Sequence, residues 1–408
     1  MYDLIVIGGG PAGMLGAATA GRNGLKVVLL EKNDVLGKKL RITGNGRCNI
    51  TNSGAVDDFQ KSIVNNGKFM YSSFSSFDNM LMIALMRSLG VRLKVEKDNR
   101  VFPASDRSVD VVDALRRHLR ENGVEIRLNA EAEEILVKDG WVSGVLLKNG
   151  VRIKCAKVLL ATGGVSYRQT GSTGDGYRMA RNLGHSIVEP RPALVPLVSG
   201  EDWVKDLRGV TLDNVRVRAS AGSRAAEQDG ELLFTHFGLS GPAIINLSSY
   251  LSRKTLFPAE IEIDLFPCFS KEQLEDRLRD CLKQNSGRYL KNAMGVLLPQ
   301  KMVPVIFEKA GLDPQKQVDV ATREDIALLA RQMKKLTVDV SGLRPLNEAI
   351  ITSGGIDTKE INPSTLESKI IKGLYFAGEI IDVDALTGGY NLQIAFSTGY
   401  LSGASAAL

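Results

Sequence analysis

The chain has 408 residues, of which 44% are hydrophobic and 24% are charged. This composition is typical of a globular protein of two or three domains and excludes the disordered and fibrous classes. The 52 Lys and Arg residues exceed the 46 Asp and Glu residues, but they are scattered along the chain, so we do not expect a nucleic-acid partner.

The four cysteines, Cys48, Cys155, Cys268 and Cys281, lie far apart, with no C-x-x-C spacing among them. This argues against a metal site, a redox dithiol and a secreted disulfide framework. No basic segment precedes the first apolar run, and no apolar run approaches the roughly eighteen residues of a membrane span. We therefore expect a cytoplasmic protein without a signal peptide.

The first thirty residues predict a strand, a glycine turn, a helix and a second strand. Tyr2–Ile7 and Lys26–Glu31 are short apolar runs, and the segment between them, Pro11–Arg22, is rich in small residues. Near-continuous apolar runs are typical of parallel strands that are buried on both faces. The fold class that follows is α/β, with a Rossmann-like dinucleotide-binding domain.

The glycine turn carries the pattern Gly8-x-Gly10-x-x-Gly13, and Glu31 follows eighteen residues after its last glycine. These glycines permit a tight turn, close approach to a pyrophosphate and packing of helix on strand. Glu31 can accept from a ribose hydroxyl and would repel a 2′-phosphate, which favours FAD or NAD over NADP. A plain flexible turn is the competing interpretation. Cofactor contacts are expected from Gly8, Gly10, Pro11, Ala12, Gly13, Glu31 and Lys32.

Further along, the chain predicts a helix, a small antiparallel meander and a buried strand that ends in a glycine turn. The helix is Ser108–Gly123, the meander strands are Val124–Asn129, Glu133–Lys138, Trp141–Lys148 and Val151–Cys155, and the buried strand is Lys157–Ala161. A second helix is expected over Ser172–Leu183. Proline-rich, alternating segments from Glu189 predict a β-rich insert, and Lys271–Lys335 is mostly helical in pattern. A strand, Gly373–Ala377, and a helix, Asn391–Leu408, end the chain.

Five segments carry a resemblance to a flavoprotein family that includes aminoacetone oxidase-type enzymes and a flavoprotein of bacterial bile-acid metabolism. They are Thr43–Asn52, Leu160–Gly164, Thr170–Tyr177, Phe234–Pro242, and Phe376–Glu379 with Gly388–Gln393. The resemblance implies an FAD-binding domain built from residues 1–188 and 343–408. It also implies an inserted β-rich domain, residues 189–268 and 325–342, and a small helical domain, residues 269–324.

Except for Lys39 and Asp382, the flavin contacts that we expect lie in these segments. Glycine-rich loops offer backbone amides to the polar edge of a flavin, and the start of the last helix could stabilise a reduced, anionic ring. Either could instead be an ordinary turn or helix entry. The expected contacts are Lys39, Thr43, Gly44, Gly46, Arg47, Cys48, Asn49, Thr162, Gly163, Gly164, Gly174, Gly378, Glu379 with Asp382 as its rival, Gly389, Tyr390, Asn391 and Leu392.

Three residues are candidates for catalysis: Arg47 could stabilise negative charge, Tyr167 could meet a substrate, and His236 could act as a catalytic base. A lone histidine without a visible partner is more often structural. Cys48 is more typical of a packed residue than of a nucleophile, although covalent flavin attachment through it is an alternative.

Together these features predict an FAD-dependent oxidoreductase that transfers a hydride between flavin N5 and a small amine, ketone or enone. No second G-x-G-x-x-G follows a strand, so NAD(P)H would bind transiently, or oxygen would be the electron partner. A flavoprotein that acts on RNA and a non-catalytic FAD-binding scaffold are the alternatives.

Overall fold

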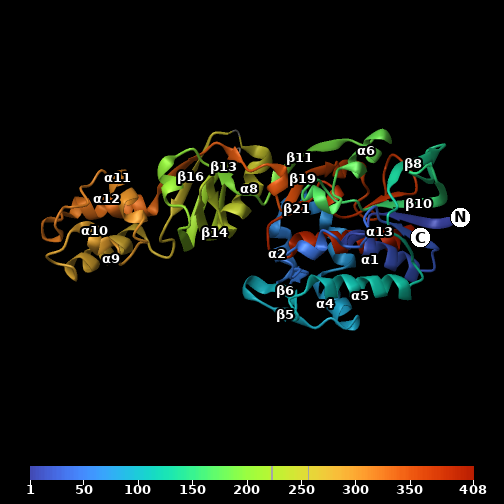
Figure 1. The fold of residues 1–408 in the computed structure, drawn as a ribbon, viewed down its shortest axis with the longest axis horizontal. Coiled ribbons are helices and arrows are strands. Elements are labelled where there is room, and N and C mark those ends of the chain that lie inside the picture. Colours follow the sequence, from blue (N-terminus) through green and yellow to red (C-terminus); the bar gives the residue numbers. More distant parts are fainter. Residues whose placement is uncertain (222–223, 256) are drawn as a thin grey trace. The chain divides into compact units, whose positions relative to one another are not determined.

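The structure is a computed structural model that describes residues 1–221, 224–255 and 257–408. Its contacts divide the chain into two compact units (Figure 1). The first unit comprises Met1–Pro192 and Leu346–Leu408, and the inserted unit comprises Ala193–Pro345. Both chain ends therefore belong to the first unit.

A seven-stranded sheet forms the centre of the first unit. Its parallel part has the order β7 (Glu125–Arg127), β2 (Val27–Leu30), β1 (Tyr2–Ile7), β10 (Arg152–Leu160) and β20 (Leu374–Phe376). The amino-terminal half of β10 continues into an antiparallel meander with β9 (Trp141–Leu147) and β8 (Ala132–Lys138). β1 and the helix α1 (Pro11–Arg22) have the predicted bounds.

Two predicted features of this sheet are wrong. β7 is the parallel edge strand beside β2 and not a meander strand, and β10 is one strand where two were predicted. Alternation of apolar and polar residues is the same in an edge strand and in a meander, so the pattern alone could not place β7. β10 joins the two parts of the sheet without a turn.

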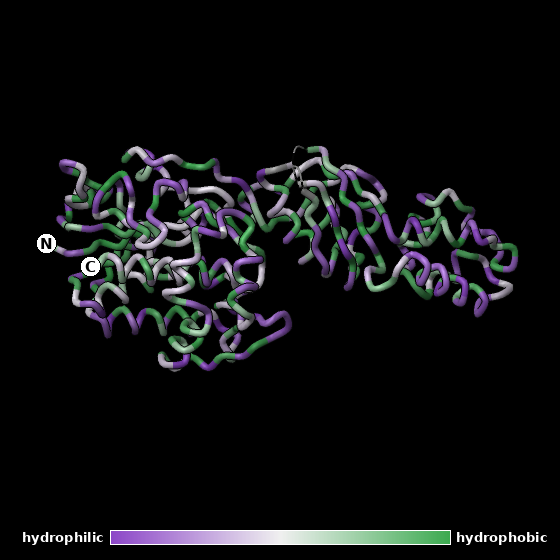
Figure 2. Tube along the Cα trace, turned by 180° about the vertical axis from the view of Figure 1, so that it is seen from behind, coloured by the Kyte–Doolittle hydropathy of each residue, from purple (hydrophilic) through white to green (hydrophobic). Residues whose placement is uncertain are grey.

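The strands alternate their side chains between two hydrophobic cores, as a doubly covered sheet requires. Leu4 and Val6 of β1 pack with the helices, whereas Ile5 and Ile7 pack on the meander side. The helical layer consists of α1, α5 (Ser108–Glu121) and α13 (Tyr390–Ala406). Figure 2 shows hydrophobic residues concentrated along the central strands of this unit.

Smaller elements surround this centre. The helices are α2 (Val56–Ser62), α3 (Tyr71–Ser76), α4 (Asn79–Ser88) and α6 (Asp175–Asn182). The strands β3 (Thr51–Asn52), β6 (Arg100–Pro103) and β5 (Leu93–Val95) form one small sheet. Two further pairs are β4 (Ile63–Asn65) with β21 (Asp384–Ala385), and β11 (Ile187–Ala193) with β19 (Ile351–Ile356).

The inserted unit is built on one antiparallel sheet with helices. The strand order is β17 (Leu336–Val340), β16 (Ala259–Asp264), β13 (Thr211–Ala221), β14 (Arg224–Thr235), β15 (Gly238–Ser240), β12 (Leu197–Val198) and β18 (Gly342–Leu343). Its helices are α7 (Asp202–Asp206), α8 (Pro242–Lys254), α9 (Lys271–Lys283), α10 (Leu290–Met294), α11 (Met302–Ala310) and α12 (Arg323–Lys334). One hydrophobic core includes residues of the sheet and of these helices, and its division into β-rich and helical domains stays a prediction.

Helices α1 and α13 pack with their backbones in near contact. A Cβ added to Gly403 would lie 2.2 Å from the carbonyl oxygen of Gly16, and one added to Gly399 would lie 2.3 Å from that of Ala12. Small residues at these positions allow the helices to approach closely. Among the described residues, no helix has both the length and the apolar character that crossing a membrane requires.

We expect Gly403→Ala to lower the free energy of unfolding by about 1–3 kcal/mol, because the added methyl group forces the two helices apart. Urea denaturation followed by circular dichroism measures this difference. Ala404→Ser, at the next and only partly buried position, is the control and should change stability by less than about 0.5 kcal/mol. Equal stability of the two variants would contradict the close packing.

Candidate functional site

The three glycines of the turn after β1 are required for different reasons. Gly8 has φ +108°, and a Cβ there would lie 2.4 Å from the carbonyl oxygen of Ala161. A Cβ on Gly13 would lie 1.9 Å from the carbonyl oxygen of Gly8, so α1 could not pack on the strand. Gly10 has an ordinary φ of −79°, and apart from its chain neighbours no atom of the described residues lies within 4 Å of its Cβ position. The protein itself leaves this space open, as a ligand that touches the backbone requires.

The open space lies at the amino-terminal end of α1. Within the described parts of the chain, the backbone amides of Ala12 and Gly13 have no hydrogen-bond partner. Unpaired first-turn amides and the helix dipole together favour a bound phosphate. The residues present therefore fit the pyrophosphate of FAD.

Glu31, at the carboxyl end of β2, is oriented toward the same turn. The residue is 8% exposed, and one carboxylate oxygen accepts from the backbone amide of Gly9 at 2.7 Å. The other oxygen accepts from the amide of Asn33 at 2.8 Å. The carboxylate is thus held beside the space at Gly10, although its contact with a ribose stays a prediction.

Lys39 and Glu379, two expected flavin contacts from opposite ends of the chain, form an ion pair. The Lys39 Nζ donates to Glu379 Oε2 at 2.7 Å and to the Ser166 hydroxyl at 2.7 Å. The backbone amide of Thr352 donates to Glu379 Oε1 at 2.8 Å. Burial opposes ionisation, but the charge of Lys39 and the hydrogen bonds from Lys39, Thr352 and Gly164 hold the pKa of the Glu379 carboxyl below its ordinary value.

The predicted flavin loop, Thr43–Asn52, contacts the start of α13. The Thr51 hydroxyl donates to Gln393 Oε1 at 2.7 Å, and Asn52 Nδ2 donates to the carbonyl of Gly388 at 3.0 Å. With its amide nitrogen oriented toward backbone carbonyls, Asn49 accepts from the amide of Gly389 at 2.9 Å. Two segments far apart in sequence therefore meet at a helix start that could face a ligand.

Arg47 is paired with acidic side chains outside the loop. Its guanidinium donates to Glu96 at 2.9 Å, lies 3.4 Å from Asp106 and stacks 4.2 Å above the ring of Phe102. Its charge is thus already compensated, which favours a role in holding the loop. Cys48 is fully buried with φ +64°, and burial raises the pKa of its thiol to about 12, so the thiol is protonated at neutral pH.

The structure places the other expected residues as follows. Lys32 bonds to Thr173 and Asp175 on either side of Gly174, at 2.6 and 2.5 Å. Thr162 has a buried hydroxyl without a hydrogen-bond partner among the described residues. The Asp382 carboxylate accepts from Asn66 at 3.0 Å, so Glu379 and not Asp382 forms the ion pair with Lys39.

Two of the three catalytic candidates, Arg47 and Tyr167, belong to the first unit, and His236 belongs to the inserted unit. Tyr167 follows the glycine turn after β10 and has a left-handed backbone, with φ +51° and ψ +53°. His236 is exposed and lies between β14 and β15 of the inserted unit. Sequence reasoning missed Ser166 and Thr352, because isolated hydroxyl residues carry no motif. Their only signal is the neighbouring double glycines, Gly163–Gly164 and Gly354–Gly355.

Comparison with known proteins identifies similarity along the whole chain. A model of the HI0933-like protein Rossmann domain family matches residues 2–405. The 3-dehydro-bile acid delta(4,6)-reductase of Clostridium scindens is 31% identical over 100% of this chain and 99% of its own. The ribosomal RNA dihydrouridine synthase of Escherichia coli is 32% identical over 98% of this chain and 96% of its own. The ribosomal RNA dihydrouridine synthase of Haemophilus influenzae is 31% identical over 97% of this chain and 96% of its own.

Solved structures are similar in fold. The 3-ketosteroid-delta4-(5alpha)-dehydrogenase of Rhodococcus jostii RHA1 has a TM-score of 0.52 at 16% identity, covering 100% of this chain and 97% of its own. The 3-ketosteroid delta1-dehydrogenase of Sterolibacterium denitrificans has a TM-score of 0.52 at 16% identity, covering 100% and 99%. At these identities the likeness supports the architecture alone.

We expect Glu379→Gln to destabilise the protein at pH 7 and to lose this effect in acid. Because its pKa is lowered on folding, the carboxylate stabilises the protein fully above the unfolded value, about 4.3, and not below the folded value. Urea unfolding of the apoprotein between pH 7 and pH 3 measures the difference from the parent. The exposed Glu189→Gln is the control, and a pH-independent loss in Glu379→Gln would contradict the ion-pair account.

Proposed function

We propose that this chain, which belongs to the HI0933-like Rossmann-domain family of FAD-dependent oxidoreductases, reduces carbon–carbon double bonds conjugated with a carbonyl group. The observation that carries the proposal is the shared chemistry of its full-length relatives. A delta(4,6)-reductase of a 3-dehydro-bile acid and a dihydrouridine synthase both saturate a double bond of this kind. The proposal therefore favours a reductase, and an enone as substrate, over an oxidase of amines.

A bound, reduced FAD would supply the hydride for the β-carbon of the double bond, with reduced nicotinamide as the proposed source of its electrons, and the α-carbon would need a proton. The chain's own residues bind and orient. The amides of Ala12 and Gly13 would hold the pyrophosphate, and Glu31 would accept from the adenosine ribose. The Lys39–Glu379 pair would lie along the ribityl region.

We assign the proton at the α-carbon to the Tyr167 hydroxyl. This hydroxyl has no hydrogen-bond partner among the described residues, and its backbone is held in the left-handed conformation just beyond the glycine turn at Gly164. Strained backbones of this kind are concentrated at functional sites. Arg47 is excluded from this role by its ion pairs, and His236 of the inserted unit is the competing candidate.

We expect the anaerobically reduced holoprotein to be reoxidised by 2-cyclohexenone or a 3-oxo-delta4 steroid, and the oxidised holoprotein to remain unreduced by aminoacetone. Tyr167→Phe should slow reoxidation by about 10²-fold or more while leaving reduction by NADPH or NADH unchanged. Stopped-flow absorbance of the flavin measures both half-reactions. Rapid bleaching by aminoacetone would instead support the aminoacetone oxidase-type activity. If Tyr167→Phe is reoxidised at the parent rate and His236→Gln is reoxidised more slowly, the proton donor is His236 of the inserted unit.

A uracil base in ribosomal RNA is the second candidate substrate. Two of the full-length relatives are named ribosomal RNA dihydrouridine synthases. The positive charge of the chain also lies almost wholly in the first unit, which has 31 Lys and Arg against 26 Asp and Glu, whereas the inserted unit has 21 against 20. A net positive charge of this kind favours a polyanionic partner.

If ribosomal RNA is the substrate, we expect the holoprotein to convert uridine to dihydrouridine, with NADPH as the electron donor. The RNA for this assay is extracted from cells that lack the gene for this protein. Mass spectrometry of the digested RNA detects the gain of two hydrogens. Binding of the RNA should weaken steeply between 50 and 200 mM salt, as phosphate contacts require. Turnover of enones without any dihydrouridine would restrict the activity to small molecules.

A further inference from the structure

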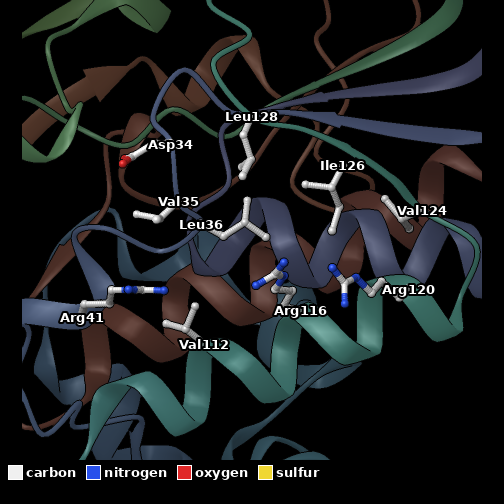
Figure 3. Close-up of a pocket in the computed structure, with 10 residues that line it drawn as sticks. All are labelled: Asp34, Val35, Leu36, Arg41, Val112, Arg116, Arg120, Val124, Ile126 and Leu128. Atoms are coloured by element: carbon white, nitrogen blue, oxygen red, sulfur yellow. The ribbon is translucent and has the colours of Figure 1, made fainter.

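A pocket with a volume of about 350 Å³ lies between α5, the edge strand β7 and the segment that follows β2 (Figure 3). It lies outside the set of residues that the proposed FAD site uses. Its lining consists of Asp34, Val35, Leu36, Arg41, Val112, Arg116, Arg120, Val124, Ile126 and Leu128. The volume is within the range of pockets that hold small organic ligands.

One wall of the pocket is apolar because of strand alternation. Val124, Ile126 and Leu128 lie at every second position along the β7 segment and line the pocket, together with Val112 of α5. Leu128 is 37% exposed, which is unusual for a large aliphatic side chain next to a core. Such a wall suits the apolar body of a ligand.

Three arginines make another part of the lining cationic. Arg116 and Arg120 project from one face of α5, and Arg41 approaches from the other end of the pocket (Figure 3). Within the described residues, none of these three guanidinium groups forms an ion pair, and the Nε of Arg41 is buried without a hydrogen-bond partner. Asp34, the one acid in the lining, is exposed, and its carboxylate points away from Arg116 and Arg120 in Figure 3. Unpaired arginines at i and i+4 repel each other unless an anion joins them.

We infer that this pocket binds a small organic oxyanion, a carboxylate or a phosphate monoester carried on an apolar or flat body. The planar guanidinium fork matches both oxyanions in a bidentate geometry. The pocket is adjacent to the glycine turn, since a Cβ on Gly9 would lie 2.5 Å from Leu36 Cδ2, and the amide of Gly37 donates to the carbonyl of Gly9 at 2.9 Å. Leu36 thus lines the pocket and packs against the turn.

The test is calorimetric titration of FAD-saturated, full-length protein with adenosine 5′-monophosphate, with decanoate and with inorganic phosphate. We expect one of the two organic anions to bind, and the variant Arg116→Gln/Arg120→Gln to weaken that binding at least tenfold. The organic anion that binds identifies the source as a phosphate ester or a carboxylate.

Arg117→Gln is the matched control. Arg117 lies on the same helix, is exposed and donates to the carbonyl of Leu89 at 3.0 Å, outside the pocket. Its replacement should leave binding unchanged. The inference is overturned if neither organic anion binds, or if inorganic phosphate binds as tightly as the organic anion that binds better. It is also overturned if the double variant binds like its parent, or if AMP binds only the FAD-free protein, because the pocket would then be the adenine end of the FAD site.

Discussion

Backbone-to-backbone contact at the glycine turn is the constraint on which the first unit depends. The carbonyl oxygen of Ala161 lies too close to Gly8 for a side chain at that residue. The carbonyl oxygen of Gly8 lies too close to Gly13 in the same way. These contacts fix the amino-terminal end of α1 at the carboxyl edge of the parallel sheet, where its free amides face open space. A helix end without partners is costly unless a ligand or water satisfies it, so the geometry that holds the turn also selects for a bound anion.

The polar contacts around this edge join segments that are distant in sequence. Lys39 meets Glu379, Thr51 meets Gln393, and Val165 and Ser166 donate from their amides to the Thr352 hydroxyl. Each pair links the amino-terminal part of the first unit to its carboxyl-terminal part. The site is therefore a property of the assembled unit, and the pairing of Arg47 with Glu96 and Asp106 shows that nearby charge is used to hold a loop.

The sequence could predict the elements whose signals are local. β1 and α1 have the predicted bounds, because a fully apolar run, three glycines and a proline at the helix start each act over a few residues. The long-range partners could not be predicted. Nothing local indicates that Glu96 neutralises Arg47 or that Ser166 and Thr352 complete the Glu379 network. Nothing local indicates either that β7 is an edge strand. The pocket beside α5 likewise depends on β7, whose place next to the α5 arginines no local pattern indicates.

The division of the first unit between the two ends of the chain has a consequence for its synthesis. α13 packs against α1, yet it follows the whole inserted unit along the chain and therefore leaves the ribosome after that unit. Until α13 has been synthesised, the apolar surface of α1 that it covers stays exposed. The inserted unit can already form its own core during this time. A nascent chain that stops short of α13 would expose that surface to chaperones and proteases.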